Sequence, residues 1–235
     1  MSIDLLPSEL PPDHYDGKEV RLDLRAKTSE GMVLNIEVQA QSQKCLDRRI
    51  MYYWAKLYSN QIQRGEDYYR LRPAYVIEVM DFNFIPDSSH YISDAQPIVS
   101  ATGKPFTEDM RLFFIELPKW NALKRKASNS LERWIAFFAN KNSAEVEEYA
   151  MLDPNIHAAL EAEKRFIANP DQMRDYWQRE KAIMERVSEL AAAETTGEAK
   201  GIAKVARTML SDNVPIQQIP KYTGLSVSEI EALQK

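Results

Sequence analysis

Two carboxylates and two amides lie on one side of a predicted β-hairpin. Residues 34–40 alternate apolar and polar side chains, and Asn35, Glu37 and Gln39 form the polar set. Residues 19–27 alternate in the same way. A three-residue loop at 29–31, with Gly31 in the left-handed conformation, is a common hairpin connection. Such a loop opposes residues whose numbers sum to 60, and this register places all the polar side chains on the same face.

Asp23 is directly opposite Glu37 in this register. Opposed side chains have Cβ atoms roughly 4.5–5.5 Å apart, so the two carboxylates repel unless a cation lies between them. A hard divalent ion resolves the conflict, because Mg²⁺ takes one or two protein carboxylates and keeps positions for water and phosphate oxygens. The polar face is therefore a candidate metal site. The alternative is a solvated sheet face on which Arg21 and Arg25 neutralise the two acids.

The composition of the chain is that of a soluble globular protein. Its 235 residues are enough for one large domain, or one domain plus an appendage. The sequence contains no apolar run of about 20 residues and no signal-peptide pattern at its start, so we expect a cytoplasmic protein without a membrane span. The single cysteine, Cys45, excludes an internal disulfide, and the three histidines lack zinc-ligand spacing.

The charged residues are unevenly distributed along the chain. Residues 42–72 contain 7 basic and 3 acidic side chains, whereas residues 145–198 contain 13 acidic and 6 basic ones. A second basic cluster lies at 119–127. This division suggests a polyanion partner such as DNA for the first half, although charged runs are also typical of solvated helix faces. The basic residues expected to contact DNA are Arg48, Arg49, Lys56, Lys124, Arg125 and Lys126.

The hydrophobic pattern predicts an α/β core followed by an all-helical extension. Expected strands are 19–27, 32–41, 73–82, 90–100 and 111–120, and a helix is expected over 45–64. Expected later helices are 128–140, 143–151, 155–167, 170–193, 201–212, 215–222 and 226–234, with a joint at 195–201. These elements divide the chain into a core at 1–127, a helical extension at 128–196 and a C-terminal module at 197–235.

Asp23 followed one hairpin later by Glu37-Val38-Gln39 resembles the signature of the PD-(D/E)XK nucleases, with Gln in place of the usual Lys. The form with Gln resembles the PD-(D/E)XK nuclease family transposases. Blocks 16–39, 48–82 and 113–120 resemble that family in order, as does the acidic helical tail closing with TGLSVSEIEAL. The resemblance implies a restriction-endonuclease-like mixed sheet with flanking helices.

The resemblance also implies roles for individual residues. Asp23 and Glu37 would ligate Mg²⁺ or another divalent cation, with the Val38 carbonyl as a third ligand. Gln39 would orient the attacking water or a phosphate oxygen, but its amide cannot act as a base or supply charge. Arg49 and Tyr53, one helical turn apart, are the nearest candidates to supply the missing charge and contact DNA. The alternative is that they are ordinary residues of an amphipathic helix.

The chain departs from the family at its front. The family usually opens with a helical segment, for which there is no room before Pro7, so we expect a truncated or internally started member. Two functions remain open. One is a Mg²⁺-dependent DNA endonuclease linked to recombination or mobile elements. The other is a weak or inactive relative that binds DNA or a partner chain and regulates it.

The C-terminal module at 197–235 resembles a helix–turn–helix unit, with Gly224 in the turn. Its last helix carries Glu229 and Glu231, which would repel phosphate, so we do not expect it to read DNA. Its apolar residues are numerous for so short a segment. We therefore expect it to pack on a partner, most simply in a homo-oligomer.

Overall fold

The computed structural model of the chain describes residues 2–7, 9–10, 20–21, 23–140 and 144–233. It divides into two compact units, residues 1–160 and 161–235. Among the described residues, none of the helices is both long and apolar enough to cross a membrane.

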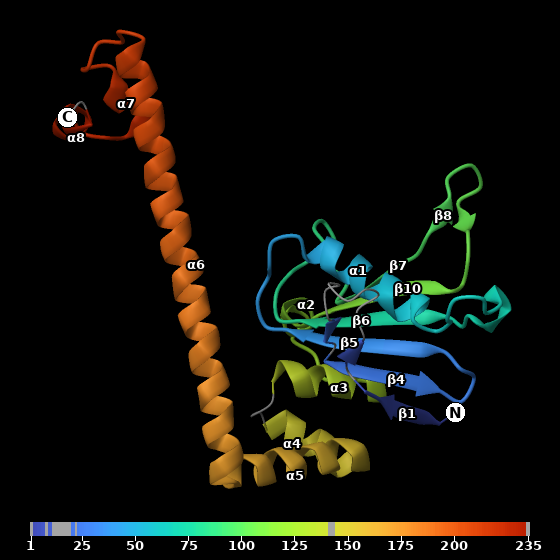
Figure 1. Cartoon of the computed structure of the whole chain (residues 1–235). Coiled ribbons are helices and arrows are strands. Elements are labelled where there is room, and N and C mark those ends of the chain that lie inside the picture. The colour runs from blue at the N-terminus through green and yellow to red at the C-terminus, as the bar shows by residue number, and fades with distance from the viewer. Residues whose placement is uncertain (1, 8, 11–19, 22, 141–143, 234–235) are drawn as a thin grey trace. The chain divides into compact units, whose positions relative to one another are not determined.

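A six-stranded mixed sheet forms the centre of the first unit (Figure 1). Its strand order is β1-β4-β5-β6-β10-β7. The strands of this sheet are β1 (Ile3–Leu6), β4 (Leu24–Thr28), β5 (Val33–Gln39), β6 (Ala74–Met80), β7 (Ile92–Ala95) and β10 (Met110–Glu116). Two further pairs are β2 (Glu9–Leu10) with β3 (Val20–Arg21) and β8 (Ile98–Val99) with β9 (Lys104–Pro105).

The two central strand pairs, β5–β6 and β6–β10, are parallel, and the outer pairs are antiparallel. A parallel pair needs a crossover connection, and α1 (Leu46–Ser59) followed by the short 3₁₀ helix η1 (Tyr68–Arg70) supplies it between β5 and β6. The mixed sheet with flanking helices confirms the predicted restriction-endonuclease-like fold class.

Helices cover both faces of the sheet. Leu46 and Ile50 of α1 pack against alternate residues of β6 and β10, such as Val76 and Phe114. The opposite face carries a second core around Trp120. The helices on that side are α2 (Leu117–Ala122), α3 (Ser130–Ala139), α4 (Ala144–Leu152) and α5 (Pro154–Ala168), the last of which extends into the second unit.

Three details of the first unit differ from the predictions. β1 was not predicted, since its four residues precede Pro7 and carry too short a pattern, yet they pair with β4 at the sheet edge. The predicted strand 90–100 is two short strands, β7 and β8. The predicted strand 111–120 ends at Glu116, where Pro118 allows a new helix to begin at Leu117.

The second unit contains one helix much longer than predicted. α6 (Pro170–Ser211) runs without a break for 42 residues, so the joint predicted at 195–201 is wrong. Gly197 and Gly201 lie inside the helix, where each costs only about 1 kcal/mol relative to Ala and the neighbouring Ala, Glu and Lys residues favour helix. The predicted boundary between residues 196 and 197 therefore falls within a helix.

The end of the second unit has a small core of its own. α6 is followed by α7 (Ile219–Thr223) and α8 (Val227–Ala232), and Ser226 caps α8 in the predicted capping box with Glu229. Ala206, Ile219 and Ile230 are fully buried together, surrounded by other apolar side chains of the same segment. The segment thus buries much of its apolar surface internally.

Candidate active site

The hairpin register predicted from Gly31 is confirmed. Leu24 pairs with Ile36 and Arg25 with Asn35, so opposed residue numbers sum to 60. Gly31 has a φ of 89°, in the left-handed region that favours glycine. Beyond the last strand pair, the backbone N–H of Asp23 donates to Glu37 Oε1 at 3.2 Å, and the N–H of Val38 donates to Asp23 Oδ2 at 3.0 Å. Asp23 and Glu37 are therefore direct neighbours across the hairpin.

The polar face of β5 is buried. Asn35, Glu37 and Gln39 are 0%, 4% and 9% exposed, whereas the side chain of Val38 on the apolar face is half exposed. The polar face lies on the side of α1, whose Tyr53, Trp54 and Leu57 pack close to the start of β5 and β6. The interpretation of this surface as a solvated sheet face is therefore wrong.

Burial gives Glu37 an unusual environment. Its Oε1 also accepts a hydrogen bond from Asn35 Nδ2 at 3.1 Å, which fixes the orientation of the carboxylate. Burial, and then the charge of Asp23, raise the pKa of Glu37 above its ordinary value, while its hydrogen bonds and the Arg49 charge act in the opposite direction. A cation bound beside Glu37 would relieve both penalties.

Arg49 and Tyr53 lie on α1 near the Glu37 carboxylate. The Arg49 guanidinium is 5.8 Å from the centroid of the Tyr53 ring and donates a hydrogen bond to Gln43. The pKa of the Tyr53 hydroxyl is raised above its ordinary value, chiefly by burial. The Arg49 charge opposes this rise, and the Glu37 charge adds to it. The Arg49 guanidinium is therefore close enough to Glu37 to affect the charge of that carboxyl.

Sequence reasoning missed a third carboxylate, that of Glu78. It lies on β6 directly beside Glu37 in the parallel register, and it is 1% exposed. Burial, followed by the charge of Glu37, raises its pKa to about 8. The signal was present in the sequence, because Glu78 interrupts the otherwise apolar run from Ala74 to Met80.

The two predicted metal ligands fit a magnesium site that keeps water or phosphate in its other positions. Within the described residues, hydrogen bonds use Asp23 Oδ2 and Glu37 Oε1, and no partner binds the second oxygen of either carboxylate. No three acidic, histidine or cysteine side chains of the described chain are arranged to hold an ion together. An ion here would therefore take two carboxylates, the predicted Val38 carbonyl and exchangeable ligands.

The side chain of Gln39 lies on the same buried face as Glu37, two residues further along β5. Its backbone carbonyl accepts a hydrogen bond from the Asp81 N–H at 2.9 Å, which extends the pairing of β5 and β6 beyond their last residues. Within the described structure, no protein group hydrogen bonds to the Gln39 amide. The amide is thus available to a water molecule or a phosphate oxygen.

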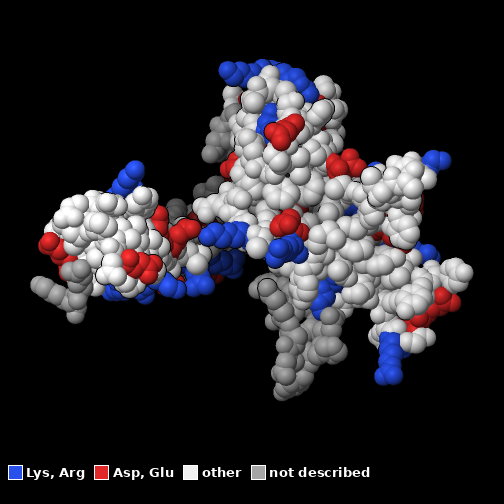
Figure 2. Space-filling model, turned by 90° about the horizontal axis from the view of Figure 1, so that it is seen from above, with Lys and Arg blue, Asp and Glu red and all other residues white. Residues whose placement is uncertain are grey.

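The basic residues expected to bind DNA occupy different environments. Arg48 is exposed on α1, but Lys56 is only 6% exposed, which leaves little of it for a phosphate contact. Figure 2 shows Lys and Arg in small groups, with Asp and Glu among them, between broad uncharged areas. The predicted division of charge along the sequence therefore does not give one continuous basic surface on this face.

The second basic cluster is largely engaged in ion pairs. Arg125 stacks on Trp120 at 4.9 Å and binds both carboxylate oxygens of Glu132, at 2.8 and 2.6 Å. The pKa of Glu132 is lowered, chiefly by this hydrogen bonding. Lys126 pairs with Glu148 at 2.6 Å. Sequence reasoning did not foresee these pairs, because the acids lie 7 and 22 residues away along the chain.

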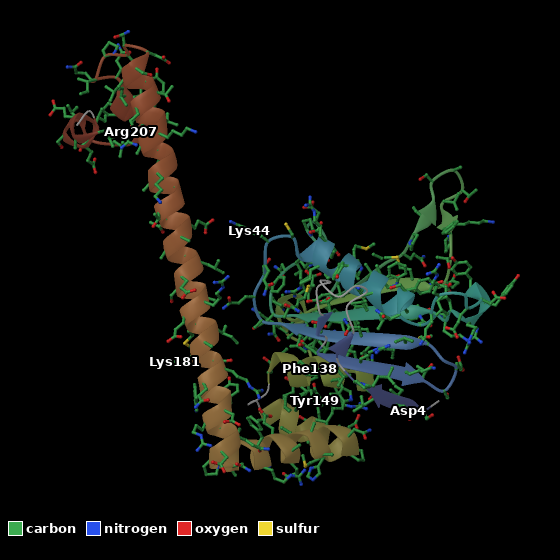
Figure 3. All side chains as sticks on the ribbon, in the orientation of Figure 1. Asp4, Lys44, Phe138, Tyr149, Lys181 and Arg207 are labelled. Carbon is green, nitrogen blue, oxygen red and sulfur yellow. The ribbon has the colours of Figure 1, made fainter. Side chains whose placement is uncertain are left out.

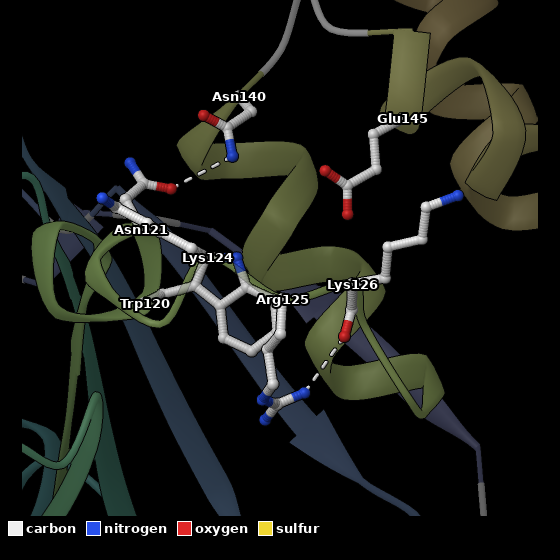
Figure 4. A pocket seen from close by; sticks show the side chains of 7 residues that line it. All are labelled: Trp120, Asn121, Lys124, Arg125, Lys126, Asn140 and Glu145. Carbon is white, nitrogen blue, oxygen red and sulfur yellow. Dashed lines mark hydrogen bonds between the residues drawn. The ribbon is translucent and has the colours of Figure 1, made fainter.

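Lys124, Arg125 and Lys126 also line a hollow of about 310 Å³ beside α2 (Figure 4). Among the residues that line it, Asn140 donates to Asn121 at 3.0 Å, and Arg125 donates to the Lys126 carbonyl. Lys124 is exposed there and has a left-handed backbone, with a φ of 49°. Of the three predicted DNA contacts in this cluster, Lys124 is the one that forms no ion pair with an acid among the described residues.

The mixed sheet with flanking helices agrees with a comparison to known families. A search of curated proteins and a search of solved structures both found no match. The family model of the PD-(D/E)XK nuclease family transposases, however, matches residues 1–193, which is most of the chain. The protein therefore belongs to the PD-(D/E)XK nuclease family transposases.

Proposed function

We propose that this chain is a DNA endonuclease that uses Mg²⁺ or a similar divalent cation to hydrolyse phosphodiester bonds. The observation that carries the proposal is a pair of neighbouring carboxylates, Asp23 and Glu37. The Asp23 N–H donates to Glu37, the Val38 N–H donates to Asp23, and Glu37 is buried. A buried carboxylate such as Glu37 is costly unless it is paired with a positive charge or coordinates a metal ion. Membership of a nuclease and transposase family supports the same chemistry and a role connected with mobile elements.

In the proposed reaction, Asp23 and Glu37 hold the ion, and Asn35 keeps the Glu37 carboxylate in its orientation. A bound divalent ion supplies a water molecule of lowered pKa and neutralises charge on the phosphate. The Gln39 amide would orient that water or a phosphate oxygen by hydrogen bonding. Arg49 would bring positive charge to the phosphate, a role that usually belongs to the Lys that Gln39 replaces.

We place the DNA contact at α1 rather than along the whole basic half of the chain. Arg48 is exposed on this helix and Arg49 lies beside the carboxylates, whereas Arg125 and Lys126 are already paired with acids. Phosphate contacts release counterions, so binding should weaken steeply between 50 and 200 mM salt. The Arg48→Gln variant should bind DNA less tightly and with a smaller salt dependence than the unmodified chain, whereas Lys126→Gln should change neither as much.

A plasmid-nicking assay tests the proposed activity. With Mg²⁺ the unmodified chain should nick supercoiled DNA, and EDTA should stop the reaction. Glu37→Gln keeps the shape of the side chain but removes the charge, so we expect at least a 100-fold slower rate. Glu30→Gln, in the exposed hairpin loop, is the matched control and should cut normally. Equal cutting by Glu37→Gln and the unmodified chain would contradict the proposal.

The alternative, a regulatory relative without activity, makes a different prediction in the same assay. DNA would then bind in a salt-dependent way, but neither Mg²⁺ nor Glu37 would matter for any cleavage. The intact carboxylate pair and the nearby Arg49 favour the endonuclease.

We also propose that the second unit joins two copies of the chain. Tyr176, Ile183 and Leu190 recur at seven-residue intervals along α6, with Val187 between them, and all four are exposed. Figure 3 shows side chains, Lys181 among them, projecting along this helix. A seven-residue apolar repeat is typical of a helix that pairs with another copy of itself. Light scattering should give a dimer or larger assembly, which Ile183→Lys should dissociate and Lys181→Glu should not.

A further inference from the structure

Glu78 is a buried carboxylate without an evident structural partner. It is 1% exposed, and its Oε2 has no hydrogen-bond partner within the described chain. The next residues on the same face of β6 are Val76 and Met80, both fully buried, and its register partner on β10 is Phe114. A buried polar atom with no partner is costly, so such an atom in a folded protein calls for an explanation.

On the side of β6 that faces β5, the neighbours of Glu78 are residues of the candidate active site. Glu37 is its register partner on β5, and the electrostatic field at Glu78 comes from Glu37, Arg49 and Asp23. Arg49 is the cation of this group, and its guanidinium donates to Gln43. If all three acids are ionised, they and Arg49 sum to a net charge of −2, which one divalent ion would neutralise.

We propose that Glu78 is a further acidic residue of the divalent-cation site and acts on the ion through a bound water molecule. This inference rests on the proposed function of Asp23 and Glu37 as metal ligands. Because no three acids of the described residues are arranged to hold an ion directly, Glu78 is a positioning residue rather than a ligand. Its free Oε2 would accept a hydrogen bond from water on the ion, which satisfies the buried oxygen and the charge together.

Calorimetric titration with Mn²⁺, in the absence of DNA, tests this inference. Glu78→Gln has nearly the same shape but no charge, so it should bind Mn²⁺ about 10- to 100-fold more weakly than the unmodified chain. Glu78→Asp keeps the charge and should retain more affinity than Glu78→Gln. Glu30→Gln is again the control, and Glu37→Gln should bind no ion. Melting curves in EDTA confirm that each variant is folded.

The outcomes separate this inference from the proposed function. If the unmodified chain binds Mn²⁺ and Glu37→Gln does not, the proposed metal site stands. Equal Mn²⁺ affinity for Glu78→Gln and the unmodified chain would then overturn the role of Glu78 alone, since a neutral buried acid is well mimicked by Gln. If the unmodified chain does not bind Mn²⁺ at all, the metal site itself is refuted, and with it the role of Glu78.

Discussion

Replacing Glu78 with Gln should change how the stability of the metal-free protein depends on pH. The unfolded chain ionises this carboxyl at its ordinary pKa of 4.5, whereas in the folded protein burial and the charge of Glu37 raise the pKa to about 8. The folded state therefore holds the proton more tightly. The stability that this group contributes is fully present below pH 4.5 and is lost as the pH rises through 8.

The size of the effect follows from the difference between the two pKa values. Each pKa unit corresponds to about 1.4 kcal/mol, so between pH 5 and pH 8 the unmodified chain should lose roughly 3 kcal/mol of unfolding free energy through Glu78. Glu78→Gln has no proton to lose and should not show this part of the decline. The two proteins should be similar in stability at pH 5, and Glu78→Gln should be the more stable at pH 8.

Urea unfolding in EDTA at several pH values measures this difference. Tryptophan fluorescence is a suitable signal, because Trp54 and Trp120 lie in the two cores of the first unit. Glu30→Gln, a change at an exposed carboxylate, should follow the pH profile of the unmodified chain. Parallel profiles for Glu78→Gln and the unmodified chain would refute the argument, because Glu78 would then ionise at the same pH in the folded and unfolded states.

Three further substitutions test other parts of the structure. Lys119→Met should lower the free energy of unfolding in urea by about 3–5 kcal/mol, because the buried Glu116 carboxylate loses its ion-pair partner at 2.7 Å. Lys126→Met removes an exposed ion pair and should change the stability little. Gly197→Ala should stabilise the second unit by about 1 kcal/mol in thermal melting, because α6 is continuous there; a loss of stability would contradict that continuity. Gly31→Ala should lower the free energy of unfolding by about 1–3 kcal/mol, because φ is 89° and the added Cβ would lie 3.1 Å from the Arg72 side chain. An unchanged urea-unfolding curve would contradict this backbone strain.

The fold of the first unit could be predicted because its information is local. Alternation marked β4 and β5, and Gly31 fixed their register, so the position of Asp23 beside Glu37 followed without a structure. The three- and four-residue spacing of Leu46, Ile50 and Leu57 similarly predicted α1 and its buried side. These patterns each depend on residues close together in the sequence.

What sequence reasoning missed depends on distant partners or on weak preferences. The pairing of Arg125 and Lys126 with acids could not be read from a basic cluster, because a charge pattern does not say which acids fold against it. Glu78 appeared to be one polar residue in a buried strand until the parallel register placed it beside Glu37. The continuity of α6 was missed because two glycines were treated as a break, although each weakens a helix only slightly.

In the proposed site, position 39 of the sheet has the neutral Gln39 instead of the usual Lys, and the positive charge is proposed to come from Arg49 on α1. A Lys on β5 would be fixed by the same strand that holds Glu37, but Arg49 depends on how α1 packs over the sheet. That packing is apolar, through Ile50 and its neighbours on β6 and β10. Small changes in this core should therefore shift Arg49 relative to the carboxylates. Ile50→Val, which removes one methyl group, should then slow DNA cleavage by more than its modest cost in stability explains.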